Sequence, residues 1–255
     1  MSLTKEQMRD YDEKGFVVLR NYYTKECIIN IGLWLDELEL KHPREDEEAK
    51  YYEISEISGE HILIRVENIN LVDNQEIMNT LINAKAIDCL TQLFEEPPIL
   101  FKEKINYKLP GCRADKLHQD QAAGWNNYSD YFISMGIIID KNRKENAALS
   151  FMHSGNYKKS LMCKEWEPLT LEDPPYHPAD EYILLEADPG DVIFFNSYVP
   201  HGSPPNNSNK KRRNIFFTFN KESDGDMRAK YYMDKFKVYP PNNVNSARSE
   251  NSYRV

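Results

Sequence analysis

Two histidines and one aspartate in this chain have the types and spacing to bind a metal ion. His118 and Asp120 form an H-x-D step, and His201 follows much later. On an extended strand, side chains two positions apart point to the same side, so His118 and Asp120 can reach one ion while Gln119 faces away. Two imidazoles and one carboxylate occupy one face of a non-heme Fe(II) ion and leave the opposite positions open. An H-x-D step alone is common, and the distal histidine makes a metal site the better interpretation.

Two adjacent arginines follow the distal histidine and could bind a carboxylate. Arg212 and Arg213 begin a predicted strand, one hairpin after the buried strand that precedes His201. A guanidinium group binds a carboxylate with two parallel hydrogen bonds. Because strand side chains alternate, the two arginines point to opposite faces and only one can serve the site. Metal ligands and an arginine in one sheet are what an enzyme that binds a keto acid at iron needs.

Composition limits the class of protein. The chain has 255 residues with 32 basic and 41 acidic side chains, a formal net charge of −9. That length suits one domain over residues 1–255, and the charge argues against a nucleic-acid partner. Four cysteines without a C-x-x-C pair indicate reduced thiols. No apolar run approaches the ~20 residues of a membrane span, so we expect a cytoplasmic protein with a small-molecule substrate and no membrane partner. The oligomeric state is left open.

The chain begins with helical segments and continues with strands. Thr4 and Gln7 predict a capping box for a helix over residues 5–14, which Gly15 ends. Further helical regions are expected from 24 to about 43 and from about 74 to 94. Expected strands are 16–19, the segment from Pro97 onward, 131–140, 147–152, 182–186, 191–197 and 214–220. This order predicts an α+β fold whose second part is a sandwich or jelly roll, with a mobile tail after about residue 241.

The strand that follows Pro97 has one polar face. Its apolar positions are Ile99, Phe101, Ile105 and Tyr107, and they alternate with Lys102, Lys104, Asn106 and Lys108. This period of two predicts a strand with an apolar face and a positively charged face.

Together these features resemble the phytanoyl-CoA dioxygenase family of Fe(II)- and 2-oxoglutarate-dependent oxygenases. The resemblance covers nearly the whole chain and rests on the segments KEQMRDYDEKGFVVLRNYYTKE, FKEKINYKLPG, HQD, DPGDVIFFNSYVPHGSPPNNS and RRNIFFTFN. It implies a double-stranded β-helix (jelly-roll, cupin-like) core flanked by amino-terminal helices. It also implies Fe(II) as the metal, with 2-oxoglutarate and O2 as co-substrates.

The resemblance assigns roles to residues of this chain. The implied metal ligands are His118, Asp120 and His201, and the implied 2-oxoglutarate contacts are Arg212, Ser203 and Asn106. The family spacing from the distal histidine favours Arg212 over Arg213 for the far carboxylate of 2-oxoglutarate. Because Asp120 retains the carboxylate that family halogenases lack, the implied reaction is hydroxylation coupled to decarboxylation of 2-oxoglutarate to succinate and CO2.

One loop departs from the family pattern. Many members have a P-G-S-H turn where this chain has Met152, His153, Ser154 and Gly155. Substrate contacts from that loop are therefore not carried over.

Two other segments indicate a substrate class. HQDQAAGW and the late segment RAKYYMDK look like the subgroup that oxidises 2-aminoethylphosphonate and related aminophosphonates at the carbon next to phosphorus. Candidate contacts for the anionic end are Lys104, Lys108, Arg65 and Arg213, and those for the ammonium end are Tyr51, Tyr52, Trp125 and Glu67. The aromatic residues could equally be packing residues, and Arg65 could serve only an ion pair.

Two alternatives stay open. One keeps the chemistry but changes the substrate to a CoA-linked or natural-product scaffold, which the acidic chain with few glycine-rich lids makes less attractive. The other is a non-catalytic jelly-roll binding protein with a vestigial metal site. That second alternative requires a missing ligand or arginine, and none is missing from the sequence.

Overall fold

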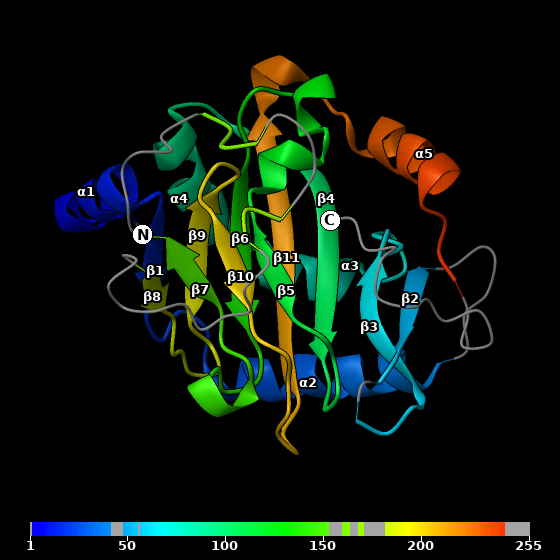
Figure 1. Ribbon diagram of the computed structural model, residues 1–255. Coiled ribbons are helices and arrows are strands. Elements are labelled where there is room, and N and C mark those ends of the chain that lie inside the picture. The colour runs from blue at the N-terminus through cyan, green and yellow to red at the C-terminus, as the bar shows by residue number, and fades with distance from the viewer. Residues whose placement is uncertain are drawn as a thin grey trace.

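Two antiparallel sheets lie opposite each other in the computed structural model (Figure 1). The model describes residues 2–41, 48–55, 57–152, 160–163, 168–170 and 182–242. The larger sheet has seven strands in the order β1-β9-β6-β11-β4-β3-β2, and the smaller has four in the order β5-β10-β7-β8. This arrangement, together with the helices that precede it, confirms the predicted α+β jelly-roll fold.

The elements follow the chain in the predicted sense, with most helices first and most strands later. The helices are α1 (Lys5–Lys14), α2 (Lys25–Leu40), α3 (Gln75–Leu81), α4 (Ala84–Phe94) and α5 (Arg228–Val238), and the short 3₁₀ turns include η1 (Asp120–Ala123) and η2 (Trp125–Asn127). The strands of the larger sheet are β1 (Phe16–Leu19), β2 (Ala49–Ile54), β3 (His61–Glu67), β4 (Pro98–Lys108), β6 (Ile133–Ile138), β9 (Val192–Asn196) and β11 (Arg212–Lys221). Those of the smaller sheet are β5 (Asp115–His118), β7 (Ser150–Met152), β8 (Tyr182–Leu184) and β10 (His201–Ser203).

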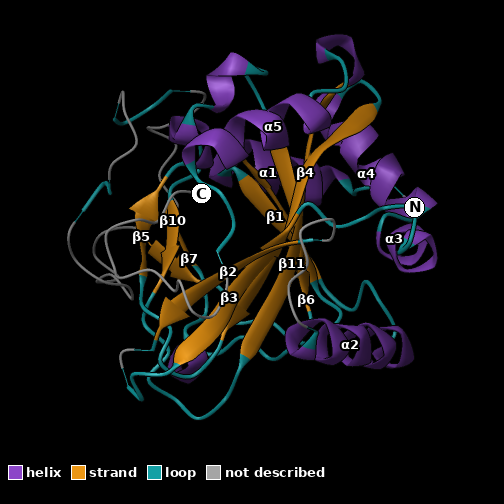
Figure 2. Ribbon diagram, turned by 90° about the vertical axis from the view of Figure 1, so that its right-hand side faces the viewer, coloured by secondary structure: helices purple, strands orange, loops and turns teal. Residues whose placement is uncertain are grey.

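Helices α2, α3 and α4 cover the outer face of the larger sheet, away from the smaller one (Figure 2). Ile31 and Leu35 of α2 are buried in one cluster with Ile105 of β4 and Ile215 of β11. The helical spacing of the apolar residues in α2 therefore has a packing cause, because a single stripe must meet the sheet. This cluster, the main core, lies between the helices and the larger sheet. The space between the two sheets is therefore available for a site.

The interior between the two sheets is apolar on one side and polar on the other. Phe151 of β7, Phe195 of β9 and Phe216 of β11 are buried together there. Toward β4, the interior instead receives the lysine-rich face that the sequence predicted, with Lys102 and Lys104 both buried. A metal site at this boundary would have an apolar wall on one side and cations on the other.

Local predictions for the helices hold with one exception. The capping box of α1 is confirmed, with Gln7 N–H donating to Thr4 Oγ1 at 3.2 Å and Gly15 ending the helix at φ 79°. The helical region expected over 74–94 is two helices, because the chain leaves helical geometry at Ile82 and Asn83 caps α4 from there. None of the helices in the described ranges combines the length and apolar character that a bilayer-spanning segment requires.

Three strands and one α-helix were not expected from the sequence: β2, β3, β10 and α5. Two of the earlier expectations concern parts of the chain outside the described residues. These are the tail, of which residues 243–255 are not described, and positions 153–155 of the departing loop.

Candidate metal and co-substrate site

Strands β5 and β10 bring the two histidines together. His118 is the last residue of β5, His201 is the first of β10, and the two are paired in register. Gly202 permits this close approach, because a Cβ atom at that position would lie 2.7 Å from the backbone oxygen of Asp115. The pairing of two short strands thus places residues that are distant in sequence at one point.

Asp120 reaches the same point by a slightly different route from the one predicted. The expectation of one strand through the whole H-x-D step is wrong, because β5 ends at His118 and Asp120 begins η1. Gln119 between them is nevertheless extended, with φ −109° and ψ 127°, so the two flanking side chains still share a side. The Gln119 amide points away and donates to the backbone oxygens of Tyr198 and Ser160.

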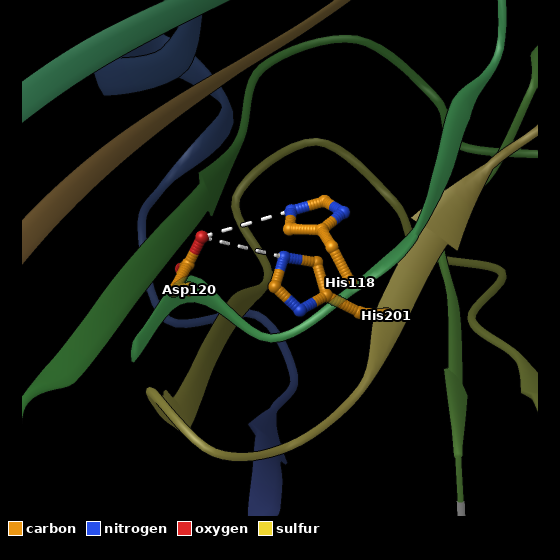
Figure 3. Close-up of side chains that lie close together, drawn as sticks. All are labelled: His118, Asp120 and His201. Carbon is orange, nitrogen blue, oxygen red and sulfur yellow. Dashed lines mark ion pairs between the residues drawn. The ribbon is translucent and has the colours of Figure 1, made fainter. Parts of the chain in front are cut away.

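The three side chains point toward one another (Figure 3). Asp120 Oδ1 lies 3.7 Å from His118 Nε2 and 4.0 Å from His201 Nε2. The candidate ligand atoms all lie within 4.8 Å of one another, and all three residues are buried. Such a group can hold one metal ion between its members.

Hydrogen bonds fix how each imidazole presents itself. His118 Nδ1 donates to the Lys116 carbonyl at 2.7 Å, and His201 Nδ1 donates to the Val199 carbonyl at 3.0 Å. A carbonyl only accepts, so each Nδ1 carries a proton, and in a neutral ring Nε2 then has its lone pair directed to the centre of the site. Burial and the neighbouring His118 lower the pKa of His201 to about 4, which keeps that ring neutral, as a metal ligand must be.

The donor set fits an Fe(II) ion. Asp120 Oδ1 is buried and has no hydrogen-bond partner among the described residues, although it faces two imidazole nitrogens. A buried carboxylate oxygen without a partner is costly unless a cation takes that place. Two neutral imidazoles and one carboxylate are the set that suits non-heme iron.

The two arginines at the start of β11 differ in their partners. Arg212 is 1 % exposed, its Nε has no hydrogen-bond partner, and no carboxylate of the described residues forms an ion pair with it. Burial lowers the pKa of Arg212 to about 10, and the group stays cationic at neutral pH. Arg213 instead binds Asp140 with two hydrogen bonds of 2.8 and 3.0 Å and also contacts α2 through Asp36. The structure therefore does not bring Arg213 to the site, and its suggested contact with substrate is corrected.

The other expected co-substrate residues lie near Arg212. Ser203 Oγ is 3.4 Å from Arg212 Nη2 and donates to Asp115 Oδ2 at 2.8 Å. Asn106 lines one pocket with the three candidate metal ligands. Lys108 is paired with Asp115 at 2.9 Å, so it acts here as the counter-ion of that carboxylate. Asp115 is a residue that the sequence reasoning missed.

The remaining substrate candidates divide into two groups. Lys104 lines the pocket of the candidate metal ligands, whereas Arg65 and Glu67 are buried beside it and paired with each other at 3.0 Å. The aromatic candidates are packing residues: Tyr51 stacks on Tyr239, Tyr52 lies in the main core, and Trp125 packs against Phe101 and Phe132.

Two further lysines near this pocket are buried. Lys102 belongs to the positively charged face that the sequence predicted for β4, although it was not among the named substrate contacts. Lys235 of α5 donates a hydrogen bond to Glu67, which lies 168 positions earlier in the sequence. No local sequence pattern predicts a contact over that separation.

Comparisons with known proteins agree with this geometry. The family model described as Phytanoyl-CoA dioxygenase matches residues 11–214. A 2-aminoethylphosphonate dioxygenase from an uncultured bacterium is 34% identical over 93% of this chain and 89% of its own length. A methylphosphonate hydroxylase from Gimesia maris is 32% identical over 93% and 88%. The crystal structure of EctD from S. alaskensis with 2-oxoglutarate and 5-hydroxyectoine has the same fold, with a TM-score of 0.70, 18% identity and coverage of 87% of this chain and 77% of that one.

Proposed function

The chain belongs to the phytanoyl-CoA dioxygenase family and is a dioxygenase, and from this premise we propose that it hydroxylates the carbon next to phosphorus in a small alkylphosphonate. The expected substrate is 2-aminoethylphosphonate or an N-methylated analogue. The observation that carries the proposal is the position of buried Lys104 in one pocket with His118, Asp120 and His201. The two relatives named for phosphonate substrates support the same reaction class.

The co-substrates follow from the donor groups. His118, Asp120 and His201 would hold Fe(II), while Arg212, Ser203 and Asn106 would hold 2-oxoglutarate. When bound, Fe(II) and 2-oxoglutarate activate O2 for attack on an aliphatic C–H bond, with succinate and CO2 as by-products.

The chain itself supplies binding, orientation and protection from water. The backbone carbonyls of Lys116 and Val199 fix the two imidazole rings before any ligand arrives. Arg212 can bind the far carboxylate of 2-oxoglutarate with two parallel hydrogen bonds, which sets the direction of the molecule as well as its affinity. Phe195 and Phe216 line the pocket and limit access of water to it.

The cellular setting is proposed on separate grounds. All four cysteines are free thiols, which fits the reducing cytoplasm. We assign the whole activity to one catalytic domain over residues 1–255.

A coupled assay tests the proposed reaction. Succinate formation would be measured with 2-aminoethylphosphonate, its N-methylated analogues and a phytanoyl-type CoA ester, with Fe(II) and 2-oxoglutarate present. We expect succinate and an α-hydroxylated product only with the phosphonates, and neither in a His201→Ala variant. Turnover confined to the CoA ester would favour the alternative of a CoA-linked substrate and refute the phosphonate proposal.

A further inference from the structure

Four cations gather beside the candidate metal site, on strands β3 and β4 and helix α5. We refer to Arg65, Lys102, Lys104 and Lys235 as the cationic cluster. The side chain of Lys235 is 6 % exposed, and the other three residues are 8 % exposed or less. Glu67, which is 0 % exposed, lies among them.

The Glu67 carboxylate, which lies within this group, is already engaged. Glu67 Oε1 accepts from Arg65 at 3.0 Å, and Glu67 Oε2 accepts from Lys235 at 2.5 Å. Burial on its own would raise the pKa of Glu67, but Lys235, Lys102 and Arg65 hold it well below its usual range. Glu67 is therefore an ionised counter-ion with both oxygens in use, and an incoming ammonium group would have to compete with two buried cations for it.

The other two lysines of the cluster have no carboxylate partner among the described residues. Lys102 donates to the hydroxyl of Tyr231 at 3.0 Å, and its ammonium lies 5.0 Å from the centroid of the Trp125 ring. Lys104 makes no hydrogen bond or ion pair within the described part of the chain, and its ammonium lies 5.5 Å from the centroid of the Phe216 ring. Two further carboxylates line the pocket with Lys104: Asp120 faces the two histidines and would be neutralised by the metal, and Asp115 is already paired with Lys108.

Cations therefore exceed carboxylates in this buried region, and such an excess is costly without an anion. Burial and neighbouring cations lower the pKa of Lys235 to about 8 and lower that of Lys104 as well. A phosphonate group brings up to two negative charges and three acceptor oxygens, so it is suited to offset this excess.

The groups that could have recognised an amine are occupied by the protein's own cations. The Tyr51 ring has the Arg65 guanidinium 5.7 Å and the Lys235 ammonium 5.6 Å from its centroid. The Trp125 ring similarly faces Lys102. Glu67 is also engaged, so three of the four candidates for ammonium binding already have a cation of the protein beside them. The fourth, Tyr52, lies in the main core.

We infer that Lys104 binds the phosphonate group of the substrate, that Lys102 and Lys235 add charge behind it, and that Glu67 holds the cluster together instead of binding the amine. This inference rests on the proposed function and narrows it. The recognised feature is a small dianion, and the amine of 2-aminoethylphosphonate adds little affinity. Ethylphosphonate should then bind about as well as 2-aminoethylphosphonate.

Calorimetric binding to the anaerobic enzyme loaded with Fe(II) and 2-oxoglutarate tests the charge requirement. The ligands would be 2-aminoethylphosphonate, ethylphosphonate and ethanesulfonate, the last a singly charged analogue. We expect the two phosphonates to have dissociation constants within about fivefold of each other and the sulfonate to bind about tenfold more weakly or worse. A larger gap between the two phosphonates, or equal binding of the sulfonate, would overturn the inference.

Variants test the assignment to residues. Lys104→Met should weaken both phosphonates about 10- to 100-fold, the loss expected for a charge-assisted contact, and Lys104→Arg should restore most of the affinity. Lys235→Met should weaken binding in the same direction, so a Lys104→Met variant that failed to fold would not end the test. Lys230→Met is the matched control, because Lys230 lies on the same helix as Lys235 but is exposed. Unchanged phosphonate affinity in folded Lys104→Met, or in Lys235→Met, would refute the assignment.

Succinate formation separates this inference from the proposed function. If the variants bind as expected but no phosphonate supports succinate formation, the proposed reaction is wrong, whereas the assignment of Lys104 to phosphonate binding is supported. If phosphonates are hydroxylated while Lys104→Met binds them normally, the proposed reaction is supported and the assignment of Lys104 to phosphonate binding is wrong.

Discussion

His118 and His201 lie directly opposite each other on the paired strands β5 and β10, and their ring centroids are 4.5 Å apart. Backbone carbonyls hold both rings by their Nδ1 atoms, so hydrogen bonds within the fold orient the two ligands. Because the pairing of two strands carries the site, loss of one imidazole removes a ligand without removing the fold.

Metal binding should depend on each of the three residues. We expect Fe(II), or Mn(II) as a redox-stable substitute, to raise the midpoint of thermal unfolding by about 5–10 °C at an excess of about a hundredfold over its dissociation constant. His201→Ala should lose this rise and all turnover while it keeps the circular dichroism of the folded chain. His61→Ala, at an exposed position on β3, is the control and should behave as the parent protein. A full metal-induced shift in His201→Ala would refute the assignment of the ligands.

The two neighbouring arginines should fail in different ways. Arg212→Ala should raise the KM for 2-oxoglutarate about 100-fold, because a buried, charge-assisted contact with a carboxylate is lost. Arg213→Ala should leave that KM near its original value but lower the free energy of unfolding by about 2–3 kcal/mol, since Asp140 loses its guanidinium partner and Asp36 keeps only Lys211. Steady-state kinetics and urea unfolding of both variants measure these effects. The opposite pattern would mean that the register chosen for β11 is wrong by one residue.

Strong local patterns were enough to predict the elements that frame the site. The alternation along β4 predicted its lysine face, and the capping residues predicted α1. The alternation of side chains along a strand also predicted that Arg212 and Arg213 point to opposite faces of the sheet. It did not predict which of the two faces the interior. That choice depends on Asp140, which binds Arg213 from 73 positions away.

The bounds and the pairing of the short strands of the site were beyond sequence reasoning for a physical reason. β5 has four residues and β10 has three, too few to show a period of two. Their formation depends on pairing with each other and on β7, not on local propensity. Lys235 was missed for the same kind of reason, because its role depends on Glu67 of a distant strand.

Gly202 should be intolerant of any side chain. A Cβ atom there would lie 2.7 Å from the Asp115 carbonyl oxygen, so β5 and β10 would have to separate and carry the two histidines apart. We expect Gly202→Ala to cost about 1–3 kcal/mol of unfolding free energy and to weaken metal binding. Gly32→Ala in α2 is the control, because its Cβ would meet nothing closer than 3.7 Å and alanine favours a helix. Normal metal affinity in Gly202→Ala would contradict this account of the strand pairing.

Phosphonate binding should take up protons from the buffer at alkaline pH. Burial lowers the pKa of Lys235 to about 8, despite the attraction of Glu67, so above pH 8 much of this group is neutral in the free enzyme. The charged and titratable groups around it are Arg65, Glu67, Lys102, Lys104, Tyr51 and Tyr231. A bound dianion favours the protonated form of Lys235 and raises its pKa. Binding above pH 8 is therefore coupled to the uptake of a proton by Lys235 from the buffer, and the affinity for the phosphonate falls as the pH rises above 8.

Calorimetry at pH 8.5 in buffers with different ionisation enthalpies measures this uptake directly. We expect a net uptake of protons in the parent protein and in Lys230→Met, and a smaller uptake in Lys235→Met. The ionisation of the ligand contributes equally to all three proteins. The part that remains in Lys235→Met would come from Lys102 and Lys104, whose pKa values burial also lowers. Equal uptake in Lys235→Met and Lys230→Met would show that Lys235 does not sense the bound anion, because a lysine that gains no proton on binding has gained no negative neighbour.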